Sequence, residues 1–148
     1  MSGFDLSKNR VLAGLLEGEN DKSPKGSIDA PVLDLFLYLN ALQDYYTLSS
    51  CSGRISLYQE LGRSKGVNWV LVKHGTVLAT EFKAAVYRAL KDGHDLAVKC
   101  EPMILHVRCR THEDAAVLYQ TAMDAGYRES GIGGSADKIV VAVRTTAN

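Results

Sequence analysis

Apolar residues recur at helical spacing in four stretches of the chain, and each stretch predicts one helix. The predicted helices cover residues 5–16, 28–42, 81–92 and 112–125. Ser27, Thr80 and Thr111 stand where an N-cap is expected, and Thr111 forms a capping-box-like pair with Asp114. Pro31 falls in a first turn, where its missing N–H costs little. Three of the four helices are therefore predicted from both periodicity and capping, and the first from periodicity alone.

Shorter apolar or alternating runs between these helices predict strands. The runs cover residues 54–60, 69–72, 96–100, 103–110, 127–132 and 139–143. The run that begins at Trp69 is interpreted as a buried strand, and residues 133–135 as a turn. Glu101-Pro102 separates two strands, because proline cannot join the hydrogen-bond ladder.

The stretch from Met103 to Arg110 alternates most clearly. One face carries Met103, Leu105, Val107 and Cys109, and the other carries Ile104, His106, Arg108 and Arg110. The second face is either a solvated outer face or a surface that meets phosphate groups.

Strands often follow one another without an intervening helix, which disfavours a parallel, doubly wound sheet. We expect one α+β domain over residues 1–148, with a mixed, largely antiparallel sheet and helices packed mainly on one side. A Rossmann fold is not expected, because the glycine pattern at residues 131–134 opens no helix.

Composition bounds the class of protein. The 148 residues have 46% hydrophobic content, and 17 basic residues balance 17 acidic ones, which argues against a broad electrostatic nucleic-acid binder. The chain has neither an apolar run of membrane-spanning length nor a signal-peptide pattern at its start. Three cysteines without C-x-x-C spacing suggest a reducing compartment, so a cytoplasmic protein without membrane contact is expected.

One polar stretch, Thr47–Ile55, interrupts the apolar patterns. It places a row of hydroxyls and a thiol before Gly53 and Arg54. Hydroxyls, backbone N–H groups and a cation are the chemistry of a cradle for an anion or polar ligand. The alternative is a serine-rich loop that caps the next strand, with Arg54 as a surface ion-pair partner.

Two other kinds of site have less support in the sequence. Cys51, His74, His106 and Cys109 lack the close ligand spacing of a structural zinc site, so no metal is predicted. A hydrolase that uses Cys51 or Ser52 as its nucleophile is possible by residue type, but no pattern pairs either with a histidine.

Five motifs in order carry a resemblance that spans almost the whole chain. They are Lys25–Asp29, Thr47–Ile55, Trp69–His74, Glu101–Val107 and Ala125–Ile132. Together they resemble the wybutosine-synthesising protein 3 family of tRNA-modifying methyltransferases, a eukaryotic and archaeal family. The resemblance implies that S-adenosylmethionine methylates a ring nitrogen of a tricyclic base. That base is the wybutosine precursor at the guanosine 3′ of the anticodon of phenylalanine tRNA. Related chains usually continue with a further helical segment, which this chain is expected to lack.

With this resemblance, candidate roles can be assigned. The cofactor's methionine carboxylate is expected against Ser49, Ser50, Cys51, Ser52, Gly53 and Arg54. His74 and His106 are candidates for substrate contact or proton removal. Expected tRNA contacts are Lys25, Ser27, Asp29, Arg108, Arg110, Arg128 and Ser130. Possible stacking platforms for an anticodon-loop base are Tyr45, Tyr46 and Trp69, although core packing is the stronger expectation for Trp69. The alternative function is a non-enzymatic RNA-binding or scaffold module of the same pathway.

Overall fold

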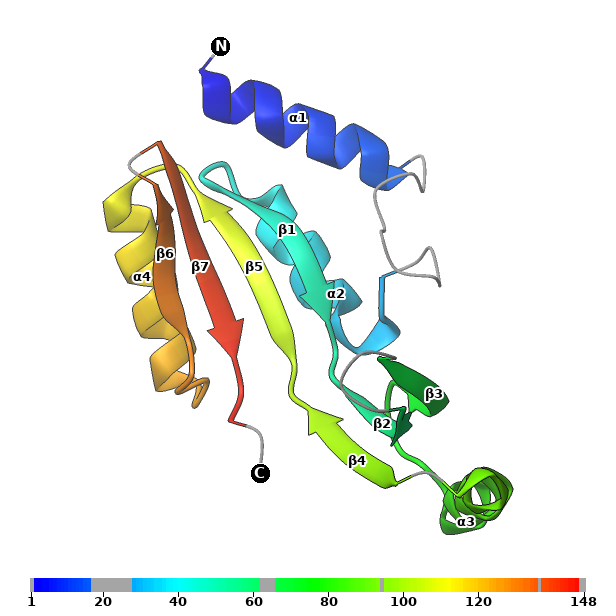
Figure 1. Cartoon of the computed structure of the whole chain (residues 1–148). Coiled ribbons are helices and arrows are strands. Elements are labelled where there is room, and N and C mark those ends of the chain that lie inside the picture. The colour runs from blue at the N-terminus through cyan, green and yellow to red at the C-terminus, as the bar shows by residue number, and fades with distance from the viewer. Residues whose placement is uncertain (1, 17–27, 62–65, 94, 136, 147–148) are drawn as a thin grey trace. The chain divides into compact units, whose positions relative to one another are not determined.

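A computed structural model describes residues 2–16, 28–61, 66–93, 95–135 and 137–146 (Figure 1). Internal contacts divide the chain into two compact units. Unit 1 comprises residues 1–52 and 103–146, and unit 2 comprises residues 53–102. Among the described residues, no helix is long and apolar enough to cross a membrane.

Unit 1 contains a four-stranded sheet in the order β1-β5-β7-β6, and every neighbouring pair is antiparallel. The strands are β1 (Tyr45–Cys51), β5 (Ile104–Cys109), β6 (Gly131–Ser135) and β7 (Lys138–Arg144). Three helices belong to this unit: α1 (Gly3–Leu16), α2 (Ala30–Ala41) and α4 (His112–Asp124). A β-bulge at Leu48 shifts the register of β1, so that Thr47 pairs with Val107 and Ser49 pairs with His106.

The core of unit 1 lies between this sheet and helices α2 and α4. Leu105, Val107 and Cys109 are buried, as their alternation along the sequence predicts. Leu39 of α2 and the small residues Ala115 and Ala122 of α4 belong to the same buried cluster. The capping box is confirmed as well, since the Thr111 side chain and the Asp114 side chain bond each other's backbone N–H groups.

Asn40 fastens α2 to β1 from a buried position. Its side-chain N–H groups donate to the carbonyl of Phe36 at 2.8 Å and to the hydroxyl of Thr47 at 2.7 Å. Its Oδ1 accepts the backbone N–H of Thr47 at 3.0 Å. One amide therefore satisfies three polar groups where the helix meets the strand.

The N-terminal end of α1 packs against the opposite face of the sheet. The Phe4 ring lies 5.1 Å from the Tyr46 ring, and the Arg110 guanidinium stacks 4.4 Å from the Phe4 centroid. Arg110 also pairs with Asp5 of α1 and with Asp44, each at 2.7 Å. One arginine side chain therefore connects α1, the segment before β1 and the end of β5.

This arrangement makes the docking of α1 dependent on pH. The hydrogen bond from Arg110, followed by those from Ser2, holds the pKa of Asp5 well below its ordinary value of 3.8. A depressed carboxyl pKa contributes stability above the unfolded pKa, and this contribution is lost as the pH falls through the folded pKa. We expect the amide protection of α1, corrected for intrinsic exchange rates, to fall below about pH 4. Hydrogen exchange followed by mass spectrometry measures it.

The matched variant is Asp5→Asn, which removes the titrating group but keeps the side-chain shape. It should loosen α1 at neutral pH and abolish the acid-dependent change. Protection of α1 that stays constant down to pH 2 in the unmodified chain would contradict this role of Asp5.

Unit 2 contains a three-stranded antiparallel sheet in the order β3-β2-β4. Its strands are β2 (Arg54–Glu60), β3 (Val67–Lys73) and β4 (Leu96–Glu101), and its helix is α3 (Ala79–Ala89), followed by a short 3₁₀ turn η1 (Leu90–Asp92). Gln59 is buried and donates to the carbonyl of Ala89 at 2.9 Å, while its Oε1 accepts from Asn68 at 2.7 Å. This amide connects the central strand to the end of α3.

The predicted α+β class with largely antiparallel pairing is confirmed, and the structure resolves it into two sheets. Several local interpretations were wrong. The N-cap of α3 is Leu78 and not Thr80, and it makes no side-chain capping bond. Trp69 is 50% exposed, because β3 pairs only with β2 and its ring lies against Tyr58 at the sheet edge. Residues 133–135 belong to β6 and residues 127–130 form the turn, since pairing with β7 overrides the turn preference of glycine.

Candidate functional site

The serine-rich stretch is a strand end in the structure, which corrects its interpretation as a loop. Ser49, Ser50 and Cys51 belong to β1 and pair with β5, so the ladder uses much of their backbone hydrogen-bonding capacity. Only Ser52 and Gly53 separate β1 from β2, and Gly53 has a φ of 92°. That conformation favours glycine at the position where the chain passes from unit 1 to unit 2.

Within unit 1, Ser52 meets a carboxylate of the chain itself. Its backbone N–H and its hydroxyl both donate to Oδ2 of Asp29, at 2.9 and 3.0 Å. Asp29 is the N-cap residue of α2, yet its side chain makes no capping bond there. These Ser52 donors therefore hold an acid, and Asp29 adds negative charge where the sequence had suggested an anion cradle.

Within unit 2, Arg54 pairs with Glu101 across neighbouring strands. Nζ of Lys99 lies 3.4 Å from the same carboxylate. The hydrogen bond from Arg54 is the main reason that the pKa of Glu101 is lowered. The guanidinium also lies 5.8 Å from the Trp69 ring centroid. Arg54 is thus a cation held between a carboxylate and an aromatic ring, so an anionic ligand would compete with Glu101.

Ser49 and His106 form a pair that sequence reasoning did not find. The Ser49 hydroxyl lies 2.8 Å from Nδ1 of His106, on adjacent strands of unit 1. Burial, and then the Arg144 cation, lower the pKa of His106 from 6.5, so the ring is neutral at physiological pH. A neutral imidazole oriented by a hydroxyl has the properties of a general base. His74, the other predicted catalytic residue, lies in unit 2, directly after β3.

Ser49 and His106 stand on the face of the unit 1 sheet opposite α2 and α4. The neighbouring strands place smaller residues beside them. Across β5, β7 and β6, one row consists of His106, Ala142 and Gly131. A second row consists of Arg108, Val140 and Gly133. A Cβ built on either glycine meets nothing within 4 Å. Exposed Lys138 and Arg144 stand at opposite ends of β7. We call this surface, defined by Ser49, His106, Arg108, Gly131, Gly133 and Arg144, the open face.

Other predicted tRNA contacts are partly engaged within the protein. Arg108 donates to the carbonyl of Ile139 at 3.0 Å and also to that of Asp137, so it supports the start of β7. Arg110 is paired with carboxylates, as described above. Arg128 is exposed, and the hydroxyl of Ser130 links the Tyr127 carbonyl at 2.6 Å to the Arg144 N–H at 3.1 Å. Lys25 and Ser27 lie outside the described residues.

The cysteines of the chain differ in their surroundings. Burial raises the pKa of the Cys109 thiol to about 12, whereas Cys100 is exposed. We expect iodoacetamide at pH 8 to alkylate Cys109 at least roughly a thousandfold more slowly than Cys100, because the thiolate is the reacting form. Peptide mass spectrometry along a time course measures both rates.

Denaturation should bring the two alkylation rates together. A Cys109 rate near that of Cys100 in the native protein would contradict the buried placement of this thiol. The variant Cys100→Ser identifies the fast-reacting peptide without changing a buried group.

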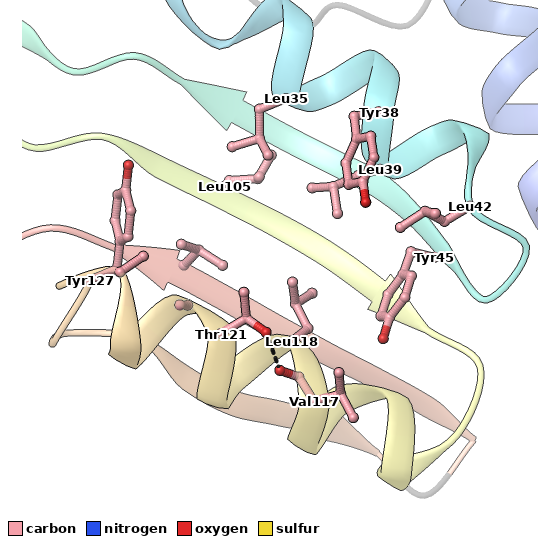
Figure 2. A pocket seen from close by; sticks show the side chains of 13 residues that line it. Leu35, Tyr38, Leu39, Leu42, Tyr45, Leu105, Val117, Leu118, Thr121 and Tyr127 are labelled. Carbon is pink, nitrogen blue, oxygen red and sulfur yellow. Dashed lines mark hydrogen bonds between the residues drawn. The ribbon is translucent and has the colours of Figure 1, made fainter.

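An apolar pocket of about 320 Å³ lies on the helix-covered side of the unit 1 sheet (Figure 2). Leu35 and Tyr38 approach it from α2, and Val117 and Thr121 from α4. The remaining lining residues are Leu39, Leu42, Tyr45, Leu105, Leu118, Ala122, Ala125, Tyr127 and Val143. Sequence periodicity assigned several of these residues to the core, and it contains no signal for a gap between two helices.

The two tyrosines predicted as possible stacking platforms lie on opposite faces of this sheet. Tyr45 lines the pocket and its hydroxyl donates to the carbonyl of Asp114 at 3.0 Å. Tyr46 is buried under Phe4, so its ring is covered in this structure.

Comparison with known proteins shows similarity over nearly the whole chain. Residues 6–148 match the family model described as Methyltransferase TYW3. The chain is 37% identical over 154 residues to tRNA wybutosine-synthesizing protein 3 of Schizosaccharomyces pombe, covering 97% of this chain and 65% of that protein. It is 37% identical over 137 residues to the Homo sapiens homolog, covering 85% of this chain and 50% of that protein.

A solved structure is similar as well. The PH1069 protein from Pyrococcus horikoshii superposes with a TM-score of 0.81 at 30% identity, covering 97% of this chain and 73% of that chain. The chain thus spans about half to two thirds of the length of the two curated relatives.

Proposed function

Since the chain belongs to the methyltransferase TYW3 family, we propose that it is an S-adenosylmethionine-dependent tRNA methyltransferase of wybutosine biosynthesis. The observation that carries this proposal is the family match over residues 6–148. The proposed substrate is the tricyclic wybutosine precursor at the guanosine 3′ of the anticodon of phenylalanine tRNA. The proposed reaction adds one methyl group to a ring nitrogen of that base.

Two groups on or beside the stretch Ser49–Arg54, each described within its own unit, support binding of S-adenosylmethionine. Arg54 offers a cation for the cofactor carboxylate, in competition with Glu101. Asp29, held by Ser52, offers carboxylate oxygens to an ammonium group or to ribose hydroxyls. The cofactor supplies an electrophilic methyl carbon on a sulfonium sulfur, and the protein positions the base and excludes water.

The reaction requires a group that removes a proton. The ring nitrogen that gains the methyl group loses its own proton, and we assign the acceptance of that proton to His106. In the tautomer in which Nδ1–H of His106 donates a hydrogen bond to the Ser49 hydroxyl, the lone pair of Nε2 is available to the substrate. The lowered pKa keeps this ring neutral, so the acid limb of the pH–rate profile should lie below pH 6.5.

The open face supports binding of the tRNA backbone. Arg144 is exposed there, exposed Lys138 stands at the other end of β7, and Arg108 adds positive charge while it donates to the Ile139 carbonyl. Gly131 and Gly133 carry no side chain on this face, so a nucleic-acid chain can approach the backbone closely. Arg144→Gln should weaken tRNA binding uniformly across sequences and reduce its salt dependence by about one phosphate contact.

The test is transfer of labelled methyl from S-adenosylmethionine to phenylalanine tRNA isolated from cells that lack this step. Mature phenylalanine tRNA is the negative control. Three variants divide the roles: Arg54→Gln, Asp29→Asn and His106→Gln. Calorimetry with S-adenosylmethionine alone separates cofactor binding from turnover.

Arg54→Gln and Asp29→Asn should each raise the cofactor Kd by about tenfold to a hundredfold, the range for hydrogen bonds to charged groups. His106→Gln should lower kcat by about 10²–10⁴ and leave the cofactor Kd unchanged. Arg88→Gln, an exposed arginine of α3, is the matched control. Cofactor binding without transfer would favour the RNA-binding or scaffold module instead.

The hydrolase alternative has a separate test. The hydroxyl of Ser52 donates to Asp29, whereas the serine–histidine pair of unit 1 uses Ser49. Inactivation by serine or thiol reagents in a protein without RNA affinity would support hydrolysis through Cys51 or Ser52 and would overturn the methyltransferase proposal.

A further inference from the structure

The apolar pocket continues along the facing sides of α2 and α4. Leu35 and Tyr38 from α2 and Val117 from α4 are all exposed at its rim, and Val117 is 63% exposed. The two central strands contribute Leu105 and Val143 to its lining. We call this feature the α2–α4 groove.

The sequence of α2 indicates that the groove is normally covered. Asp34 is the only charged residue in this helix, and both its sheet-facing and its groove-facing sides are apolar. The sheet-facing side is buried through Val32, Phe36 and Leu39. A helix that is apolar almost all round is usually buried on more than one side. Within the described part of the chain, Leu35 and Tyr38 are exposed on the groove-facing side, which favours contact with a further apolar element.

The charges that flank the groove restrict what this element is. On α2, Asp34 stands one turn before Tyr38. On α4, Glu113 stands one turn before Val117, and Asp124 stands about one turn after Thr121. Neither helix contains a lysine or an arginine. Along the chain, Arg128 and Arg144 directly follow the lining residues Tyr127 and Val143, and Arg144 belongs to the open face. Lys8 bonds the carbonyl of Leu42.

An acidic rim around an apolar floor disfavours two occupants. Phosphate groups of RNA meet like charge along both helices, whereas the open face on the other side of the sheet is basic. A second copy of the same surface would place Asp34 and Glu113 of one molecule against the acidic rim of the other. Both arrangements bring like charges together.

We propose that the α2–α4 groove binds an amphipathic α-helix of a partner polypeptide, with an apolar stripe flanked by lysine or arginine. The stripe packs on Leu35, Tyr38 and Val117, and the basic flanks face Asp34, Glu113 and Asp124. This is the helix-in-groove mode of recognition, in which anchors at i, i+3, i+4 and i+7 enter an apolar cleft. The groove is an interaction surface separate from the proposed site of methyl transfer.

The probe is a synthetic peptide of about 14 residues, which matches helices of 12 and 13 residues at 1.5 Å per residue. It carries leucine at i, i+3, i+4, i+7 and i+11 and lysine on both flanks. A second peptide keeps the leucines and replaces every lysine by glutamate. Fluorescence anisotropy with the full chain measures both affinities.

The lysine peptide should bind at least about tenfold more tightly than the glutamate peptide, and added salt should reduce the difference. Asp34→Lys combined with Glu113→Lys should reverse the preference. Val117→Ser should weaken the lysine peptide about tenfold, whereas Val98→Ser, at an equally exposed valine (59%) of unit 2, should leave it unchanged. Circular dichroism of each variant checks that it is folded.

Three results would overturn the proposal. The first is equal binding of the two peptides, or binding that Val117→Ser does not change. The second is displacement of the bound peptide by tRNA. The third is a dimer in sedimentation that Val117→Ser dissociates, which would make the groove a contact between two copies.

Discussion

Replacing Leu105 by alanine should lower the free energy of unfolding by about 3 kcal/mol, within the range of 2–5 kcal/mol for buried leucines. Leu105 is 1% exposed and stands in β5, between β1 and β7, where its side chain joins the core cluster. The substitution removes apolar contacts and leaves a void that surrounding strands fill only partly. Urea unfolding, followed by circular dichroism, measures the change in midpoint and slope.

The matched control is Leu37→Ala, at a leucine of α2 that is 57% exposed. It should change the stability by less than about 0.5 kcal/mol, because alanine also has the higher helix propensity. A cost for Leu105→Ala as small as that of Leu37→Ala would contradict the central place of β5 in the core.

Asn40→Ala should destabilise the protein by about 2–3 kcal/mol, although it removes only a few atoms. The substitution leaves the Thr47 N–H without its acceptor in a buried position and removes two donated bonds. An unsatisfied buried donor costs more than a typical hydrogen bond contributes. The same urea titration measures the loss.

Two further variants separate the components of this network. Thr47→Val removes only the hydroxyl and should cost about 1 kcal/mol, while Asn40→Asp keeps an acceptor for the Thr47 N–H but loses both donors. If Asn40→Ala cost no more than Thr47→Val, the backbone N–H of Thr47 would have found another partner. The urea concentration at the unfolding midpoint should be lowest for Asn40→Ala, higher for Asn40→Asp and highest for Thr47→Val.

Local signals predicted the elements whose causes are local. The alternation from Met103 to Cys109 gave the buried face of β5, and Thr111 with Asp114 gave the start of α4, because capping needs only residues three apart. Pro102 correctly separated β4 from β5, since it cannot donate to a ladder.

Features that depend on partners far along the chain were not predictable in this way. Successive strands β1 and β2 enter different sheets, and no local pattern states which partner a strand chooses. The contact between Ser49 and His106 joins residues 57 positions apart and requires the register of β1 on β5. The same holds for Asp29 and Ser52, 23 positions apart, whose pairing changed the expected charge of the serine-rich stretch.

The bulge at Leu48 determines which residue of the motif reaches His106. Two residues of β1, Leu48 and Ser49, occupy the length that one residue fills in a regular ladder. Deleting Leu48 alone would restore the regular ladder and leave Ser49 opposite His106, because Thr47 still pairs with Val107. When related sequences are aligned, a one-residue gap between Thr47 and Ser49 is therefore compatible with the same serine–histidine pair. The serine opposite this histidine should be identified by counting back from Cys51, the end of the strand, and not from the start of the motif.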